Sequence, residues 1–346
     1  MTEESPPKKP IPPKRVTIRD VAQAAGVSTG AVSAALAGTK SNVGVSRETR
    51  ERIQRVAHEL GYRPHAAARA MAAKSFHTIG VLAAEYCFGS YYTHVLRGLV
   101  AQAEALGYHV LLKLVPTRYD LENARIFTEQ IIDGVIIPAE AGEHTREALA
   151  RFQIPHVWLN AGVDEPINCV RPDETQGLRL AVEHLMKLGH RRIAYMPQEE
   201  PLPYHACTTR PQAYLAALVA CGLGPVPTHD QPVDIAQHVE QYLAMRPRPT
   251  AMIVYSDPIA AWAVNALVKR GVRVPEEMSV VACEGVVWLN YCYRRLTAVR
   301  APVYEMGQVA VRMLVQELET GQAVPSVTLP VSLEVNESTA PAAETA

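Results

Sequence analysis

Short apolar runs alternate with longer stretches of helical spacing from His77 onward. The runs are TIGVLAA, HVLLKLV, GVIIPA, HVWLN, RIAYM, AMIVYS and SVVAC, and roughly 10–15 residues of helical pattern separate them. Strands that alternate with helices predict parallel sheets of an α/β fold. Seven strands over about 250 residues predict two doubly wound parallel-sheet lobes. Because such sheets bind ligands at the carboxyl ends of their strands, we expect a site in the cleft between the lobes.

The pattern before this region differs, because residues 15–62 predict three short helices. Thr17, with Asp20 three residues on, is typical of an N-cap with an acidic partner, and Gly26 is placed to end that helix and turn the chain. Ser28 is placed to cap a second helix. Three apolar positions of this helix lie on one face: Val32, Ala35 and Leu36.

A third helix is predicted in SRETRERIQRVAHELG. Ser46 is placed to cap it, and Gly61 is placed to end it. Ile53, Val56 and Leu60 follow helical spacing and form the predicted buried stripe. The polar segment GTKSNVGV lies between the second and third helices, and we expect a loop there.

Charge is distributed unevenly along the chain of 346 residues, although its formal net charge is −1. Residues 1–75 carry 13 Lys and Arg against 6 Asp and Glu, whereas the remainder carries 21 against 29. A basic module joined to a larger acidic body indicates that one end of the protein meets a polyanion.

The remaining composition is typical of a globular intracellular protein. The hydrophobic fraction is 48% and the charged fraction 20%. We expect a disordered tail at 1–14, which is rich in Pro and Lys, and a short carboxy-terminal tail at 341–346. The six cysteines form no CxxC pair, no apolar run reaches the length of a membrane span, and the start has no apolar segment typical of a signal peptide. We therefore expect a cytoplasmic, nucleoid-associated protein.

Several segments in series resemble the lactose-repressor (LacI/GalR) family of bacterial transcriptional regulators. They are VTIRDVAQAAGVSTGAVSAALAG, VSRETRERIQRVAHELGYRP, ARAMAAKSFHTIGVL, SYYTHVLRGLVAQAEALGYHVLL, DGVIIPA, EHLMKLGHRRIAYM, RPQAYLAAL and GVRVPEEMSVVACEG. The resemblance covers residues 16–338. It implies a helix-turn-helix DNA-binding domain at 15–62, a hinge helix at 63–75, and an effector-binding and dimerisation core of periplasmic-binding-protein type at 76–340.

The resemblance also implies that the chain passes between the lobes three times. We place the crossings near Pro172, Pro302 and Pro325. The N-lobe then comprises residues 76–171 and 302–325, and the C-lobe residues 172–301 and 326–340.

Candidate DNA contacts follow from the match to the family. Thr29, Gly30 and Ala34 match its base-reading positions, although the family often has Arg in place of Ala34, and this loss removes a strong contact with guanine. Candidates for phosphate or groove-edge contacts are Thr17, Ser28, Ser33, Lys40, Ser41, Asn42, Ser46 and Arg47. The loop at 38–45 is longer than in well-known members, and whether it contacts DNA or is solvated stays open.

The hinge helix of the family forms on the operator and inserts an apolar side chain into the minor groove. Met71 matches the position of that wedge, which is a leucine in the family. Arg69 is suited to a groove or phosphate contact, His65 replaces the usual Asn, and Ala68 lies among small residues that permit close pairing of two hinge helices.

Candidate effector contacts also follow from the match. Arg210 matches the effector-binding arginine, and Ser256, Asp257, Glu284 and Asn160 match other polar cleft positions. Tyr86, Ser90 and Tyr91 are candidates for the opposite wall. Ser256 and Glu284 depart from the Asn and Asp of the family, so the effector does not follow from the resemblance. The alternative interpretation is that these groups are hydrogen-bonded polar residues at strand ends.

Together these features predict a homodimeric regulator, a repressor, that binds a pseudo-palindromic operator and responds to a small molecule, a carbohydrate or related metabolite. Whether the effector induces or co-represses stays open. The alternative function is a small-molecule-binding module without a DNA function. No GxGxxG, GxxxxGK[ST], GxSxG or HExxH motif is present, so we expect no enzyme, no cofactor and no metal.

Overall fold

The computed structural model describes residues 16–36, 44–64, 70, 75–83, 90–114, 129, 131–138, 143–161, 167–198, 205–227, 234–286 and 294–343. The chain divides into two compact units, Met1–Phe76 and His77–Ala346, and each is described by itself. Among the described residues, no helix is long and apolar enough to cross a membrane.

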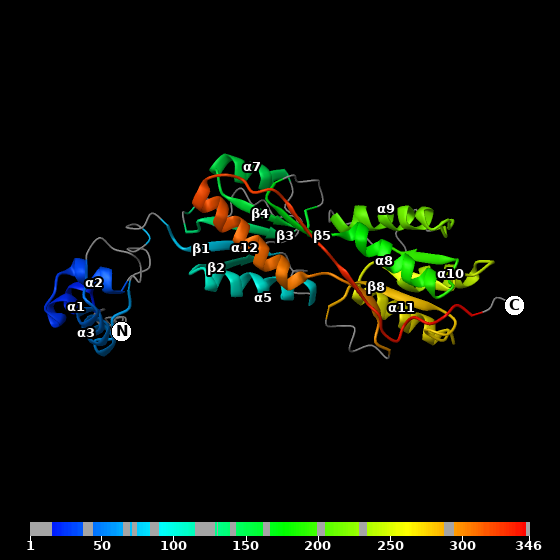
Figure 1. The fold of residues 1–346 in the computed structure, drawn as a ribbon, viewed down its shortest axis with the longest axis horizontal. Coiled ribbons are helices and arrows are strands. Elements are labelled where there is room, and N and C mark those ends of the chain that lie inside the picture. The colour runs from blue at the N-terminus through cyan, green and yellow to red at the C-terminus, as the bar shows by residue number, and fades with distance from the viewer. Residues whose placement is uncertain are drawn as a thin grey trace, which may run out of the picture. The chain divides into compact units, whose positions relative to one another are not determined.

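The first unit contains three helices, α1 (Ile18–Ala25), α2 (Thr29–Leu36) and α3 (Arg47–Glu59) (Figure 1). The predicted caps are confirmed. Thr17 and Asp20 form a reciprocal capping box, and Gly26 ends α1 in the left-handed region with a φ of 63°. The backbone N–H of Ala31 donates to Ser28 Oγ at 3.1 Å, and Ser46 Oγ accepts from the N–H of Thr49 at 3.2 Å.

The apolar stripe of α3 differs from the prediction at one position. Ile53 is fully buried, Val56 is half-buried, and Ala57 is buried in the core of the unit, whereas Leu60 is 39% exposed. Leu60 is the C-cap residue, so it lies where the helical spacing that placed it on the buried face ends. The core of the unit consists of Val21, Ala22, Ala25, Val32, Ala35, Ile53 and Ala57.

The second unit consists of two lobes, each built on one sheet. The N-lobe sheet has six strands in the order β10-β5-β4-β3-β1-β2, and neighbouring strands of this order are parallel. Its strands are β1 (Thr78–Ala83), β2 (His109–Leu114), β3 (Gly134–Pro138), β4 (His156–Leu159), β5 (Cys169–Pro172) and β10 (Val327–Leu329). Its helices are α5 (Ser90–Ala105), α7 (Glu143–Phe152) and α12 (Val303–Thr320).

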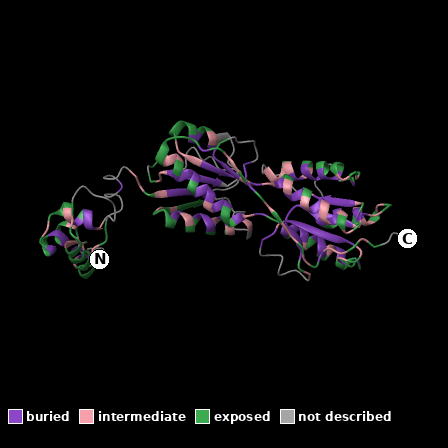
Figure 2. Cartoon of the chain, viewed as in Figure 1, coloured by how far each residue is buried: buried purple, intermediate pink, exposed green. Residues whose placement is uncertain are grey.

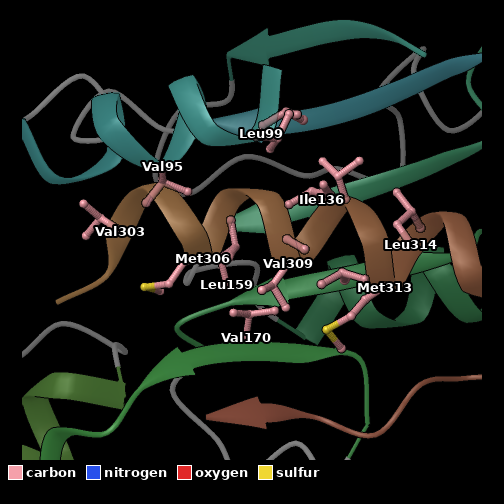
Figure 3. Packing of buried hydrophobic residues seen from close by; sticks show 14 of the residues in the cluster. Val95, Leu99, Ile136, Leu159, Val170, Val303, Met306, Val309, Met313 and Leu314 are labelled. Atoms are coloured by element: carbon pink, nitrogen blue, oxygen red, sulfur yellow. The ribbon is translucent and has the colours of Figure 1, made fainter. Parts of the chain in front are cut away.

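Alternating residues of the N-lobe strands face different helices. Ile136 of β3 packs in the cluster of α5 and α12, whereas Val135 and Ile137 pack in the cluster of α7. Figure 3 shows α12 crossing this core with Met306, Val309 and Met313 directed into it, and Figure 2 shows the buried positions gathered on the strands. Burial on both faces explains why β3 and β4 are continuous apolar runs, whereas the apolar edge strand β2 is mostly exposed.

Helices α5 and α12 approach each other closely because each has a glycine at the contact. A Cβ on Gly98 would lie 1.9 Å from the carbonyl oxygen of Tyr304, and a Cβ on Gly307 would lie 2.1 Å from that of Val95. Both atoms belong to the backbone, so no side-chain movement relieves the overlap. These glycines therefore determine how closely the helices pack.

The C-lobe sheet has five strands in the order β11-β9-β8-β7-β6, with β11 antiparallel to β9. The strands are β6 (Ile193–Met196), β7 (Ala251–Val254), β8 (Ser279–Glu284), β9 (Thr297–Arg300) and β11 (Ser332–Glu334). The helices are α8 (Glu174–Lys187), α9 (His205–Ala220), α10 (Ile235–Ala244) and α11 (Asp257–Lys269). Helices α8 and α9 pack in one core cluster, and α10 and α11 in the other.

The chain passes between the lobes three times, and one crossing differs from its predicted place. The first follows β5, which ends at Pro172, and the second precedes α12, whose N-cap is Pro302. The third was predicted near Pro325, but β10 pairs with β5 in the N-lobe sheet. The third crossing therefore follows Leu329, and residues 327–329 belong to the N-lobe.

Candidate nucleic-acid interface and ligand site

Helix α2 presents small polar residues at its amino-terminal end. Ser28, Thr29, Gly30 and Ser33 are exposed, whereas Ala34 is only 4% exposed. The methyl group of Ala34 thus presents little surface in the free chain, and its contact with a base stays a prediction. The exposed face has two hydroxyls and a glycine, which permit close approach to a groove but offer no bidentate contact to a base.

The other described DNA candidates lie at helix starts. The Thr17 side chain is exposed and occupied by its capping box with Asp20. The Arg47 side chain is 93% exposed and bonds Glu51 at 2.9 Å, an exposed pair that is weak enough to exchange for a phosphate. The remaining predicted contacts lie outside the described residues: Lys40, Ser41, Asn42, His65, Ala68, Arg69 and Met71.

The predicted effector arginine lies in the second unit and is occupied by a carboxylate. Arg210 of α9 donates from Nε and Nη2 to the two oxygens of Glu174, at 2.7 and 2.9 Å. Its Nη1 donates to the carbonyl oxygen of Tyr255, and the guanidinium lies 4.8 Å from the centroid of the Tyr255 ring. Arg210 is 3% exposed and Glu174 is 5% exposed, so the two form a buried ion pair.

Two further carboxyl groups lie at the carboxyl ends of neighbouring strands. Asp257 follows β7 and is fully buried, and its oxygens accept from the backbone N–H groups of Gly285 at 3.1 Å and Val286 at 2.7 Å. Glu284 ends β8 with a φ of 110° and is half-buried. Burial raises the pKa of Asp257 to about 7, and burial together with the charge of Asp257 raises the pKa of Glu284 to about 8.

The N-lobe contributes an amide and a phenol to the same place. Asn160 follows β4 and is 9% exposed, and its Nδ2 donates to Tyr91 Oη at 3.1 Å. Tyr91 Oη in turn donates to the sulfur of Met306 at 3.5 Å. Burial raises the pKa of Tyr91, and the charge of Glu174 raises it further. The Oδ1 atom of Asn160 is buried and has no hydrogen-bond partner.

The structure thus brings most of the predicted effector residues together. Asn160, Arg210, Asp257 and Glu284 form one cluster with Glu174 and Tyr255, and Ser256 is the buried N-cap residue of α11, where its side chain makes no capping hydrogen bond. Ser90 is the first residue of α5, and Tyr86 lies outside the described residues.

Sequence reasoning missed Glu174 and Tyr255. Glu174 begins α8, two residues after β5, and no apolar run marks β5 in the sequence, so the pattern gave no signal for Glu174. Across the described parts of the chain, no group of His, Cys, Asp and Glu side chains has the arrangement of a metal site.

A cavity of about 520 Å³ lies next to the cluster. It is lined by Gly285 and Val286, whose N–H groups bind Asp257, and by the crossing segment Arg300–Glu305. None of the four charged side chains of the cluster lines this cavity.

A three-helix module that presents α2, together with two parallel-sheet lobes that carry a buried polar cluster, defines a DNA-binding regulator with a ligand-binding core. The chain belongs to the lacI family of bacterial regulatory proteins. The model of that family matches residues 17–65, and a model described as a periplasmic binding protein-like domain matches residues 182–339. The chain is accordingly a transcriptional regulator and not an enzyme, and family membership decides against a binding module without a DNA function.

Similar proteins support this assignment over nearly the whole chain. The HTH-type transcriptional repressor CytR of Escherichia coli is 30% identical over 90% of this chain and 92% of its own length. The repressor PurR of Vibrio atlanticus is 28% identical over 88% of this chain and 92% of its own. A structure of the Lac repressor dimer bound to operator and the anti-inducer ONPF superposes with a TM-score of 0.81 at 28% identity, covering 94% of this chain and all of that one.

Proposed function

We propose that the protein is a cytoplasmic, nucleoid-associated repressor that binds a pseudo-palindromic operator as a homodimer and releases or engages it when a small molecule occupies the cluster around Arg210. Each subunit places α2 in the major groove of one half-site. The observation that carries this proposal is the exposed row of Ser28, Thr29, Gly30 and Ser33 on a helix whose opposite face is buried. The Lac repressor, a structural neighbour, is a dimer bound to operator.

Sparse base contacts on α2 require that other elements contribute to specificity. Thr29 and Ser33 offer only hydroxyls, and each such contact discriminates less than a bidentate pair. The proposed second source is Met71, which enters the minor groove and opens a base step, so that the deformability of the operator is recognised as well as its base edges.

The test of DNA recognition is a selection of genomic fragments by the purified full-length chain at two salt concentrations. The expected result is a two-fold symmetric sequence whose binding weakens as salt rises, because neutralised phosphates release counterions. Binding that depends on salt but not on sequence would contradict the proposal.

The test of the wedge is Met71→Ala, which removes the apolar side chain while keeping high helix propensity. Specific affinity should fall roughly tenfold, and affinity for random DNA should change little. Ala73→Gly, which weakens the same segment without removing the wedge, serves as the matched control. An equal loss on both kinds of DNA for Met71→Ala would contradict the role of Met71.

A further inference from the structure

The charge of the ligand-binding cluster is not balanced by its arginine. Both oxygens of Glu174 bind Arg210, so these two groups neutralise each other within the protein. A third guanidinium nitrogen binds the Tyr255 carbonyl, and the side chain is 3% exposed. Arg210 therefore presents little positive charge to a ligand, although it occupies the position of the effector-binding arginine.

Two carboxyl groups remain without a cation of their own. Asp257 is held by backbone N–H groups, which satisfy its lone pairs without supplying a full charge, and Glu284 is half-buried beside it. The raised pKa of each is the expected consequence of burying carboxyls that lack a full counter-charge. Among the described residues of the cluster there are three carboxyls and one guanidinium.

On the N-lobe side of the cluster, a buried hydrogen-bond acceptor lacks a donor. The Oδ1 atom of Asn160 is buried without a hydrogen-bond partner, while its Nδ2 is engaged by Tyr91. The backbone oxygen of Asn160 accepts from the N–H of His205 at 3.4 Å, and His205 begins α9, the helix that contains Arg210, so this amide lies next to an element of the cluster. A buried carbonyl oxygen without a donor is costly, and a bound N–H group removes that cost.

We infer that the effector is a small hydroxylated molecule with a cationic nitrogen, an ammonium or amidinium, whose N–H groups are shared between Asn160 Oδ1 and Glu284, which gives up its proton when the cation binds. An ammonium offers three donors and no acceptor, which matches a wall of acceptors. A metal ion does not fit, because no ligand set for one exists in the described part of the chain. This inference rests on the proposed function, which places the effector at this cluster.

The test compares three probes with one carbon skeleton: glucamine, whose amine is protonated at pH 8, the neutral sorbitol, and the anionic gluconate. Their binding to the full-length chain is measured by isothermal titration calorimetry and thermal denaturation. Glucamine should bind at least ten times more tightly than sorbitol, and gluconate should not bind. In Glu284→Gln the preference for glucamine should disappear, while the exposed control Glu319→Gln should keep it.

Three results would overturn the inference: sorbitol or gluconate binding as tightly as glucamine, an unchanged preference in Glu284→Gln, or no binding of glucamine at any concentration up to tenths of a molar. Fluorescence anisotropy with a selected DNA fragment in the same samples distinguishes a failure of the proposed function from a failure of the inferred ligand class. If the wild-type chain binds no DNA specifically, the proposed function fails. If DNA binding is intact and responds only to the neutral or anionic probe, the inference alone fails.

Discussion

The ion pair between Arg210 and Glu174 allows a quantitative prediction. Both side chains are at most 5% exposed and are joined by two hydrogen bonds of 2.7 and 2.9 Å. Removal of one partner of such a pair leaves a buried charge and costs about 3–5 kcal/mol of unfolding free energy. The two single substitutions should differ in their cost in unfolding free energy, because the other charged groups around the pair are carboxyls.

Arg210→Met leaves three neighbouring carboxyls without a cation, so its cost should lie at the upper end, about 4–5 kcal/mol. Glu174→Gln leaves Arg210 beside Asp257 and Glu284, which compensate it in part, so its cost should lie near or below about 3 kcal/mol. The double variant removes both charges and should cost less than Arg210→Met alone. The coupling energy should then be about 2–3 kcal/mol.

The assay is thermal and urea denaturation of the full-length chain and these three variants. At about 2–4 °C per kcal/mol for a domain of this size, Arg210→Met should lower the melting temperature by roughly 10–20 °C. The control is Arg179→Met, which removes an exposed pair with Glu183 and should cost well under about 1 kcal/mol. Additive single effects, or a cost of Arg210→Met equal to that of the control, would refute the reasoning.

Three shorter predictions concern packing, capping and titration. Gly98→Ala should destabilise the second unit by about 3 kcal/mol in urea denaturation, because its Cβ meets the backbone oxygen of Tyr304 at 1.9 Å; an unchanged midpoint would show that α5 and α12 are farther apart. Ser46→Ala should cost the first unit about 1 kcal/mol, measured by the loss of helical circular dichroism on heating, whereas Ser46→Asp should retain the cap. Because the folded-state pKa values of Asp257 and Glu284 lie above those of the unfolded chain, the unliganded protein should lose stability as pH rises from 6 to 9; Glu284→Gln should melt with a shallower pH dependence, and equal slopes would speak against it.

All seven apolar runs are strands of the two lobes. The four strands that were missed, β5, β9, β10 and β11, contain at most two consecutive apolar residues each, so no apolar run marks them. Their pairing depends on neighbours far along the chain, as when β10 joins β5, and for that reason the third crossing was placed too early.

The ligand site shows a different limit of prediction. The match to family positions predicted that Asn160, Arg210, Asp257 and Glu284 lie close together, and the structure shows this grouping. It follows from the fold, because the carboxyl ends of parallel strands meet at one edge of a sheet. The match did not predict what Arg210 contacts, since its partner lies 36 residues earlier in the chain and is chosen by the packing of α8 against α9.

The pairing of Arg210 with Glu174 changes the chemistry of the site. A guanidinium that donates to Glu174 and to the Tyr255 carbonyl has few N–H groups left for a ligand. Selectivity for the effector must then come from groups that still have unused hydrogen-bonding capacity. Within the cluster, the Asn160 carbonyl oxygen is a buried acceptor without a partner, and Glu284 is a further acceptor in its ionised form. A cluster built around an arginine is therefore expected to select a donor-rich ligand.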